Sequence, residues 1–178
     1  MSDGPTPSLP ASIIERFVQE REGWSDAEIL EELKGFPPLP GEEAFDQAAA
    51  NWRDVYRFVA LADVCAARKL RPAVVMLLER ASFGDPGETM RGLRHHLERI
   101  AEPDWDFLTD ACLEALNSPQ PGARYWAVQQ LGIMQVERTL GALQGALDDP
   151  EAEIRSEAQN AIDGFSWRPS TPKRTRRQ

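Results

Sequence analysis

Three carboxylates recur at a spacing of four residues in the second half of the sequence, at Asp106, Asp110 and Glu114. Side chains four residues apart lie on one face of an α-helix, so this spacing predicts an acidic row along a helix. A row of unpaired carboxylates attracts a basic protein and steers its approach. We therefore consider these three residues a candidate partner-binding stripe, with an ordinary solvated helix face as the alternative.

The two histidines, His95 and His96, are the next residues whose types could do chemistry. Two histidines that share a metal on a helix stand at i and i+4, whereas adjacent ones point about 100° apart. One of them could act as a general base beside Glu98 or Glu102, but a solvated or partly buried helix residue is the favoured interpretation. The sequence contains no phosphate-binding loop, dinucleotide fingerprint or nucleophile elbow. We therefore predict no catalytic residue, no metal site and no cofactor.

Two aromatic residues, Tyr125 and Trp126, directly follow Arg124. Exposed, they would be possible interface anchors, because Trp, Tyr and Arg dominate the energetic centres of protein interfaces. Buried, they would belong to the core, which is the favoured interpretation for Trp126.

A turn containing proline recurs three times at nearly constant intervals. Each copy has an Asp-Pro or Ser-Pro pair and, five residues after the proline, an arginine preceded by an apolar residue. The copies are Asp85-Pro86 with Arg91, Ser118-Pro119 with Arg124, and Asp149-Pro150 with Arg155. The arginines are separated by 124 − 91 = 33 and 155 − 124 = 31 residues, close to the length of one helix pair. Such pairs must stack, because each alone buries too little apolar surface.

This pattern resembles HEAT-like repeats, clearly over residues 118–162 and more weakly over 85–97. The resemblance implies an all-α fold, a HEAT-like helical-repeat solenoid of antiparallel helix pairs with an N-terminal helical cap. Fold alone specifies little about function.

In that family an aspartate near the turn and an arginine six residues later form charge ladders between neighbouring repeats. Two copies match this spacing, namely Asp85 with Arg91 and Asp149 with Arg155. The middle copy departs from it, because Ser118 stands where the aspartate is expected before Arg124. The resemblance therefore implies a structural ladder, interrupted at its middle copy.

Helical signals run through the chain, and the alternation typical of β-strands is almost missing. Capping boxes predict helix starts at Ser12 and Ser25, and Gly35 ends the second helix. These signals divide the chain into a disordered N-terminus (1–11), N-terminal helices (12–35), a Pro-rich connector (36–41), the HEAT-like solenoid (42–164) and a basic disordered tail (165–178). The helices expected within the solenoid are 42–69, 72–84, 87–101, 104–116, 121–133, 137–147 and 151–163.

Charge is distributed unevenly along the chain. All 29 acidic and 15 of the 20 basic residues precede residue 165, so the body carries 15 − 29 = −14, while five basic and no acidic residues follow. An acidic body repels the phosphate backbone of nucleic acids, so we expect a protein with a basic surface as partner. The tail could bind nucleic acid, lipid or an acidic partner, or it could lie against the acidic body.

The composition predicts a cytoplasmic protein with no membrane contact. No apolar run approaches the ~20 residues that span a bilayer, and the first ten residues lack the features of a signal peptide. Cys65 and Cys112 fall in apolar helical patterns, which predicts two reduced, packed thiols. Arginine outnumbers lysine by 17 to 3, which indicates a GC-rich bacterial genome.

These observations favour a non-catalytic binding module or scaffold that presents an acidic helical-repeat surface to another protein. A narrower form of this hypothesis is an immunity- or antitoxin-like inhibitor of a basic enzyme. Two enzyme classes remain as alternatives through the resemblance, a HEAT-like DNA glycosylase and a bilin-lyase-type protein. The acidic body argues against the glycosylase, which needs a basic groove for DNA.

Overall fold

The computed structural model describes residues 11–41, 49–84 and 91–166. Within these ranges every regular element is helical and no residue lies in a β-strand, which confirms the all-α prediction. The α-helices are α1 (Ala11–Gln19), α2 (Asp26–Gly35), α4 (Ala49–Arg68), α5 (Ala73–Arg80), α6 (Arg91–Ala101), α7 (Trp105–Ala115), α8 (Pro121–Met134), α9 (Leu140–Gly145) and α10 (Ala152–Ser166). Two short 3-10 helices, η2 (Glu137–Thr139) and η3 (Ala146–Asp148), flank α9.

The capping box predicted at Ser25 is confirmed. The Glu28 amide donates a hydrogen bond to Ser25 Oγ (3.3 Å), and the Ser25 amide donates one to Glu28 Oε2 (2.7 Å). The helix start predicted at Ser12 is wrong, because α1 already includes Ala11. Gly35 ends α2 as expected.

The boundary predicted between the last helix and the tail is also wrong. Helix α10 continues two residues beyond Gly164, to Ser166, and Phe165 packs against the core. Burial of this aromatic side chain extends the helix past the glycine. The predictions for residues 1–10, 42–48, 85–90 and 167–178 lie outside the described residues.

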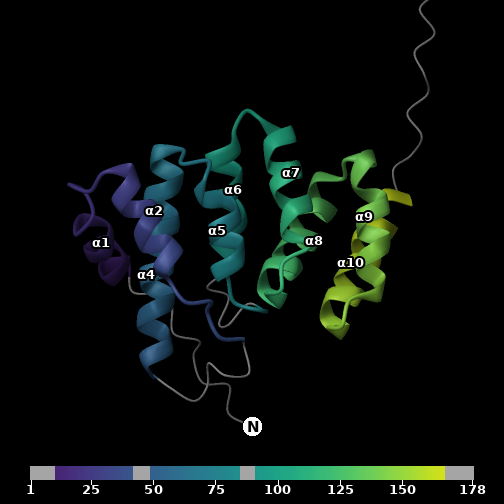
Figure 1. Ribbon diagram of the computed structural model, residues 1–178, viewed down its shortest axis with the longest axis horizontal. Coiled ribbons are helices and arrows are strands. Elements are labelled where there is room, and N and C mark those ends of the chain that lie inside the picture. Colours follow the sequence, from purple (N-terminus) through teal and green to yellow (C-terminus); the bar gives the residue numbers. More distant parts are fainter. Residues whose placement is uncertain (1–10, 42–48, 85–90, 167–178) are drawn as a thin grey trace, which may run out of the picture.

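The helices pack in two rows. Figure 1 shows the chain running along the long axis of the molecule, from α1 and α2 at one end to α9 and α10 at the other. Helices α2, α5, α8 and α10 contact one another in that order, and α1, α4, α6 and α7 do the same in the second row. The rows are joined where α4 meets α2 and where α7 meets α5 and α8. Helix α6 has α4 and α7 as its main neighbours, so α5, rather than α6, packs beside α8.

Helix α8 approaches its neighbours closely because it has glycine at two contacts. A Cβ added at Gly132 would lie 2.7 Å from the Cβ of Ala161 on α10, and one added at Gly122 would lie 2.2 Å from the Ala81 carbonyl oxygen. Neither space admits another carbon atom.

The Pro-rich connector 36–41 is non-helical, as predicted, and it packs against the end of α5. Phe36 and Leu39 are buried. The Leu39 amide donates a hydrogen bond to the Arg80 carbonyl (2.9 Å), and Ser82 Oγ donates one to the Pro40 carbonyl (2.6 Å). These bonds fix α2 beside α5 although about forty residues separate them in sequence.

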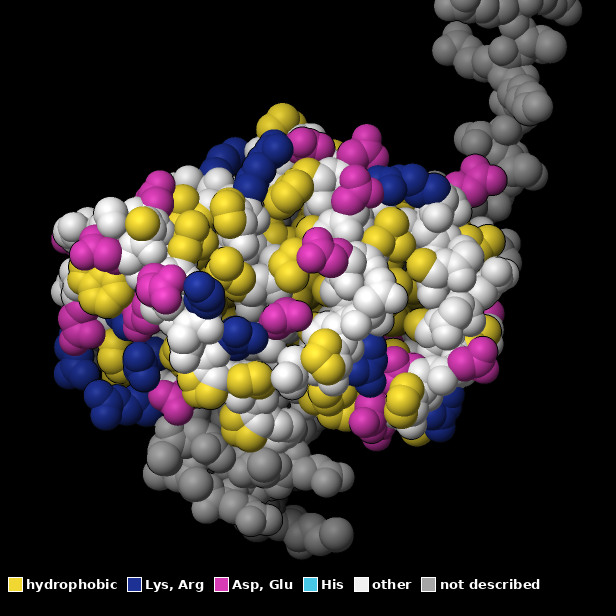
Figure 2. Space-filling model, viewed as in Figure 1, with side chains coloured by type: hydrophobic (Ala, Val, Ile, Leu, Met, Phe, Trp, Pro, Cys, Tyr) yellow, Lys and Arg dark blue, Asp and Glu magenta, His cyan; other side chains and the backbone are white. Residues whose placement is uncertain are grey.

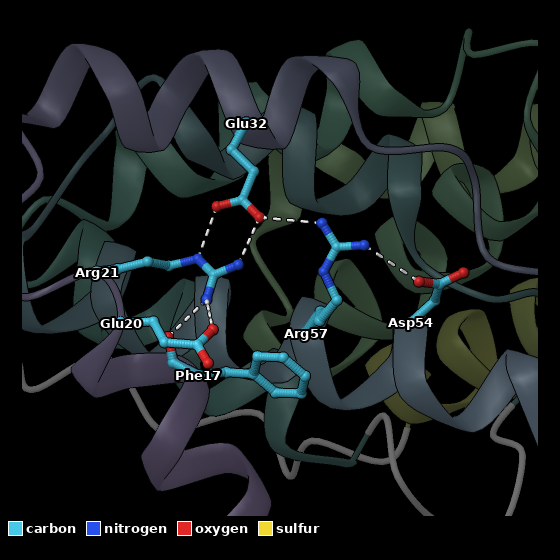
Figure 3. A network of polar contacts seen from close by, with 6 residues as sticks. All are labelled: Phe17, Glu20, Arg21, Glu32, Asp54 and Arg57. Atoms are coloured by element: carbon cyan, nitrogen blue, oxygen red, sulfur yellow. Dashed lines mark hydrogen bonds and ion pairs between the residues drawn. The ribbon is translucent and has the colours of Figure 1, made fainter.

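A buried ion-pair network joins the first three helices (Figure 3). Arg21 Nε donates to Glu32 Oε2 (2.6 Å), and Arg57 Nη2 lies 3.2 Å from Glu32 Oε1. Arg21 also donates to the Phe17 carbonyl, and Arg57 pairs with Asp54. Burial raises the pKa of Glu32, but the two guanidinium groups lower it more, so this pKa lies below its ordinary value.

Candidate functional site

The acidic row predicted on residues 106–114 lies on the exposed face of α7, but two of its members form ion pairs with an arginine. Arg138 Nη1 donates to Asp110 Oδ1 (2.6 Å), and Arg138 Nη2 lies 3.2 Å from Asp106 Oδ1. The expected row of free carboxylates is therefore wrong for Asp106 and Asp110, because η2 places a guanidinium between them. Glu114 is exposed. Hydrogen bonding to Asp110, followed by that to Asp106, raises the pKa of Arg138.

Acidic charge is nevertheless concentrated at the two ends of the body. Residues 104–163 contain 11 acidic and 3 basic residues, so they carry 3 − 11 = −8. Residues 49–84, by contrast, contain 6 basic and 3 acidic residues and carry +3. Acidic side chains are visible in Figure 2 in the centre of the face and at the α9–α10 end. Residues 11–48 contain 3 basic and 10 acidic residues and carry 3 − 10 = −7, so the negative charge of the body lies on both sides of a positively charged segment.

Each of the three arginines in residues 104–163 is already bound within the protein. Arg124 forms a two-point pair with Asp149, with Nε to Oδ2 at 2.7 Å and Nη2 to Oδ1 at 3.0 Å. Arg138 is held by the two α7 carboxylates. Arg155 Nη1 donates to the carbonyls of Asp149 (2.6 Å) and Pro150 (2.8 Å). The exposed carboxylates around them, including Glu114, Glu137, Asp148 and Glu153, keep their charge facing solvent.

The ion pair joins α8, which carries Arg124, to the turn before α10, which carries Asp149. It therefore connects neighbouring copies of the repeated turn, as the predicted charge ladder does. Burial raises the pKa of Asp149, but hydrogen bonds from Arg124 and from the Glu151 amide lower it more. Ser118, at the irregular copy, donates a hydrogen bond from Oγ to Glu79 Oε1 (3.3 Å) instead of accepting an arginine as a carboxylate would. Asp85 and the side chain of Arg91, which form the first predicted aspartate–arginine pair, lie outside the described residues.

The same arginines also close the turns that precede their helices. Arg124 Nη1 donates to the carbonyls of Ser118 (3.0 Å) and Pro119 (3.3 Å), which stand six and five residues earlier. Arg155 makes the equivalent contacts at its own turn, with the same two offsets. The two turns share the same spacing of contacts, which explains why a proline recurs five residues before an arginine.

Trp126 belongs to the core, and its alternative role as an interface anchor is wrong. Only 6% of Trp126 is exposed, and its indole Nε1 donates a hydrogen bond to the Ser82 carbonyl (2.8 Å). Tyr125 is half-buried, and its ring contacts Phe83 and Trp126 edge-on at centroid distances of 5.6 and 5.5 Å. Its side chain therefore packs around the turn after α5, and its role as an interface anchor stays a prediction.

His96 is buried at the contact between α6 and α4. Its Nε2 lies 2.7 Å from Asp63 Oδ1, and its Nδ1 has no hydrogen-bond partner among the described residues. His95 is exposed. The partly buried interpretation is therefore correct for His96, and the pair with Asp63 ties two helices of one row together. Sequence spacing gave no signal for this pair, because 33 residues separate its members.

A groove between α1, α4 and α6 has a volume of about 550 Å³. Its apolar part comes from Ile14, Val18, Val64 and Ala67, and its polar part includes Asp63 and Arg99. Arg99 and Glu15 are exposed at this groove, and so it combines apolar surface with charges of both signs.

Metal and thiol chemistry receive no support from the described residues. They contain no group of three or more His, Cys, Asp or Glu side chains placed to hold a metal ion. Cys65 and Cys112 are buried free thiols, as predicted, and burial raises the pKa of each to about 12. A thiol with so high a pKa is a poor nucleophile at neutral pH.

The sequence matches no known protein family, and searches of curated proteins and of solved structures find no match. In the part of the chain that the structure describes, no helix combines the length and apolar character needed to cross a bilayer.

Proposed function

We propose that this protein is a non-catalytic binding protein, built from HEAT-like helix pairs, that presents the acidic surface of residues 104–163 to a protein with a basic surface. The observation that supports it most is the charge of −8 on this region, whose three arginines are all bound within the protein. An excess of acidic charge on a helical framework accelerates and orients the approach of a basic partner.

The HEAT-like assignment is supported by two repeated features. The turns before α8 and α10 are closed by arginines at the same two offsets. Helices α8 and α10 also pack directly against each other, as successive first helices of repeats do. Helix α6, which follows the weaker first copy, packs on α4 and α7 rather than beside α8, so the proposal limits the HEAT-like packing to α8–α10 instead of the predicted residues 42–164.

The proposal is tested by affinity capture from a cell lysate at low salt, followed by mass spectrometry. The variant Glu114→Lys/Glu137→Lys/Glu153→Lys reverses exposed charges of the acidic surface and leaves the bound arginines in place. The matched control, Glu15→Lys/Glu22→Lys/Glu31→Lys, makes the same change in net charge on exposed residues of the N-terminal helices.

We expect one basic protein to be captured by the wild type and by the N-terminal control, and to be lost from the C-terminal variant. If the captured protein is an enzyme, assay of its activity with and without this protein tests the narrower inhibitor hypothesis. Equal capture by both variants, or no basic protein from the wild type, would contradict the proposed function.

A further inference from the structure

A groove between α8 and α10 lies within the acidic region and has the size of a single side chain. Its volume is about 210 Å³, and its lining residues are Gln129, Gly132, Ile133, Glu157, Asn160 and Ala161. They stand at i, i+3 and i+4 on each helix, so one face of each helix borders the groove. Sites for drug-sized ligands begin at about 300 Å³, which makes a side chain the better fit.

The groove combines apolar surface with a carboxylate that no described residue neutralises. Ile133 is 52% exposed, although large aliphatic side chains are normally buried. Glu157 is half-buried and forms no ion pair with a described residue. The cation nearest to it in sequence, Arg155, is engaged with two carbonyls of its own turn. A half-buried, unpaired carboxylate beside apolar surface is complementary to a long cationic side chain.

We propose that this groove binds one arginine side chain of the basic protein partner. The aliphatic stem lies on Ile133 and Ala161, and the guanidinium pairs with Glu157. Arginine suits the groove because its stem covers apolar surface while its planar head donates two parallel hydrogen bonds to a carboxylate. Gln129 Nε2 already donates to the Tyr125 hydroxyl (2.8 Å), which leaves the Gln129 side-chain oxygen as a further acceptor.

This inference rests on the proposed function, and its test uses a defined probe. A fluorescent peptide of eight arginines is titrated with the full-length protein, and its affinity is measured by fluorescence anisotropy at low salt. Glu157→Gln removes the groove carboxylate. Glu153→Gln is the matched control, because it removes an equal charge from an exposed position one turn earlier on α10, outside the groove.

We expect Glu157→Gln to weaken the arginine peptide about tenfold, which corresponds to one lost charge-assisted hydrogen-bonded pair, and Glu153→Gln to weaken it less than about threefold. Ile133→Ser should also weaken the peptide by about threefold, since it removes the apolar wall but no charge. A peptide of eight lysines should discriminate less between the two glutamine variants. In amide NMR spectra, the arginine peptide should shift Gly132 and Asn160.

Three other results would overturn the inference in different ways. If the wild type binds the peptide and both glutamine variants weaken it equally, attraction is diffuse, so the groove has no special role while the proposed function stands. If the wild type binds no arginine peptide and captures no basic protein, the proposed function fails together with the groove. If neutralising the tail by Arg174→Gln/Arg176→Gln/Arg177→Gln strengthens peptide binding tenfold or more, the tail is the occupant and an external partner is excluded.

Discussion

Arginines close turns of this protein in two ways, either from far away in the sequence or from a few residues after the turn. In the N-terminal part, Arg68 on α4 donates to the carbonyls of Trp24 (2.6 Å) and Arg21 (3.3 Å), which precede it by 44 and 47 residues. In the C-terminal part, Arg155 closes the turn at Asp149 and Pro150, only six and five residues before it.

The comparison distinguishes two ways of joining helices. The N-terminal helices are tied by long-range ion pairs around Glu32, and their arrangement forms only when distant segments meet. The α8–α10 pair instead relies on a local turn motif and on the small residues Gly132 and Ala161. Loss of a single polar group should therefore lower the free energy of unfolding more in the N-terminal part than in the α8–α10 pair.

The largest expected effect comes from Glu32→Gln. It leaves the Arg21 guanidinium, which is 5% exposed, without a charged partner at bonding distance, because Glu20 lies 4.0 Å away. Removing one member of a buried ion pair costs roughly 3 kcal/mol or more. We expect the free energy of unfolding, measured by urea denaturation, to fall by about that amount.

Its control is Glu31→Gln, one residue earlier on α2. Glu31 is 76% exposed and, among the described residues, pairs only with Lys34, at 3.7 Å. Such surface pairs contribute at most about 0.5 kcal/mol. Equal destabilisation by the two substitutions would contradict the special role of the buried network.

A smaller effect is expected from Arg68→Met, with Arg155→Met as its counterpart. Arg68 is 26% exposed and donates to carbonyls of a distant turn, so its loss should cost about 2 kcal/mol. Arg155 is exposed, and water can replace its bonds at a cost below about 1 kcal/mol. Hydrogen exchange should accelerate at residues 21–24 in the first variant and only near residue 150 in the second. Exchange that rises across both parts in either variant would show that the two turns are coupled.

The smallest effect concerns pH and sharpens the first prediction. The folded-state pKa of Glu32 lies below its ordinary value of 4.5, so its contribution to stability is complete above that pH and is lost as the pH falls through the folded pKa. The difference in unfolding free energy between the wild type and Glu32→Gln should therefore shrink below about pH 4.5. Urea denaturation at several pH values measures it, and a constant difference would contradict the assignment.

The sequence predicted the helices well because their signals are local. Ser25 with Glu28, the prolines before α5 and α8, and the turn arginines all act within a few residues. It did not predict that Arg138 would bind Asp106 and Asp110, because that contact joins residues 28 and 32 positions apart.

The same limit applies to the buried contacts and to the groove. The pairs of Glu32 with Arg57 and of His96 with Asp63 are set by which helices meet, and no local pattern encodes that choice. Glu157 and Ile133 each looked like ordinary helix residues. Their common spacing with Asn160 and Gln129 becomes visible only when α8 and α10 lie side by side.

The arginine that closes its own turn has a consequence for how such a chain can grow. Because Arg155 satisfies the carbonyls of Asp149 and Pro150, the turn and the first part of α10 carry their own closure. The segment from Ser118 to Arg124 does the same. A duplicated copy of such a segment contains the residues that form its own turn and needs only an apolar surface to pack against. The turns before α8 and α10 can thus form from their own residues, whereas the turn between α1 and α2 needs Arg68 from α4.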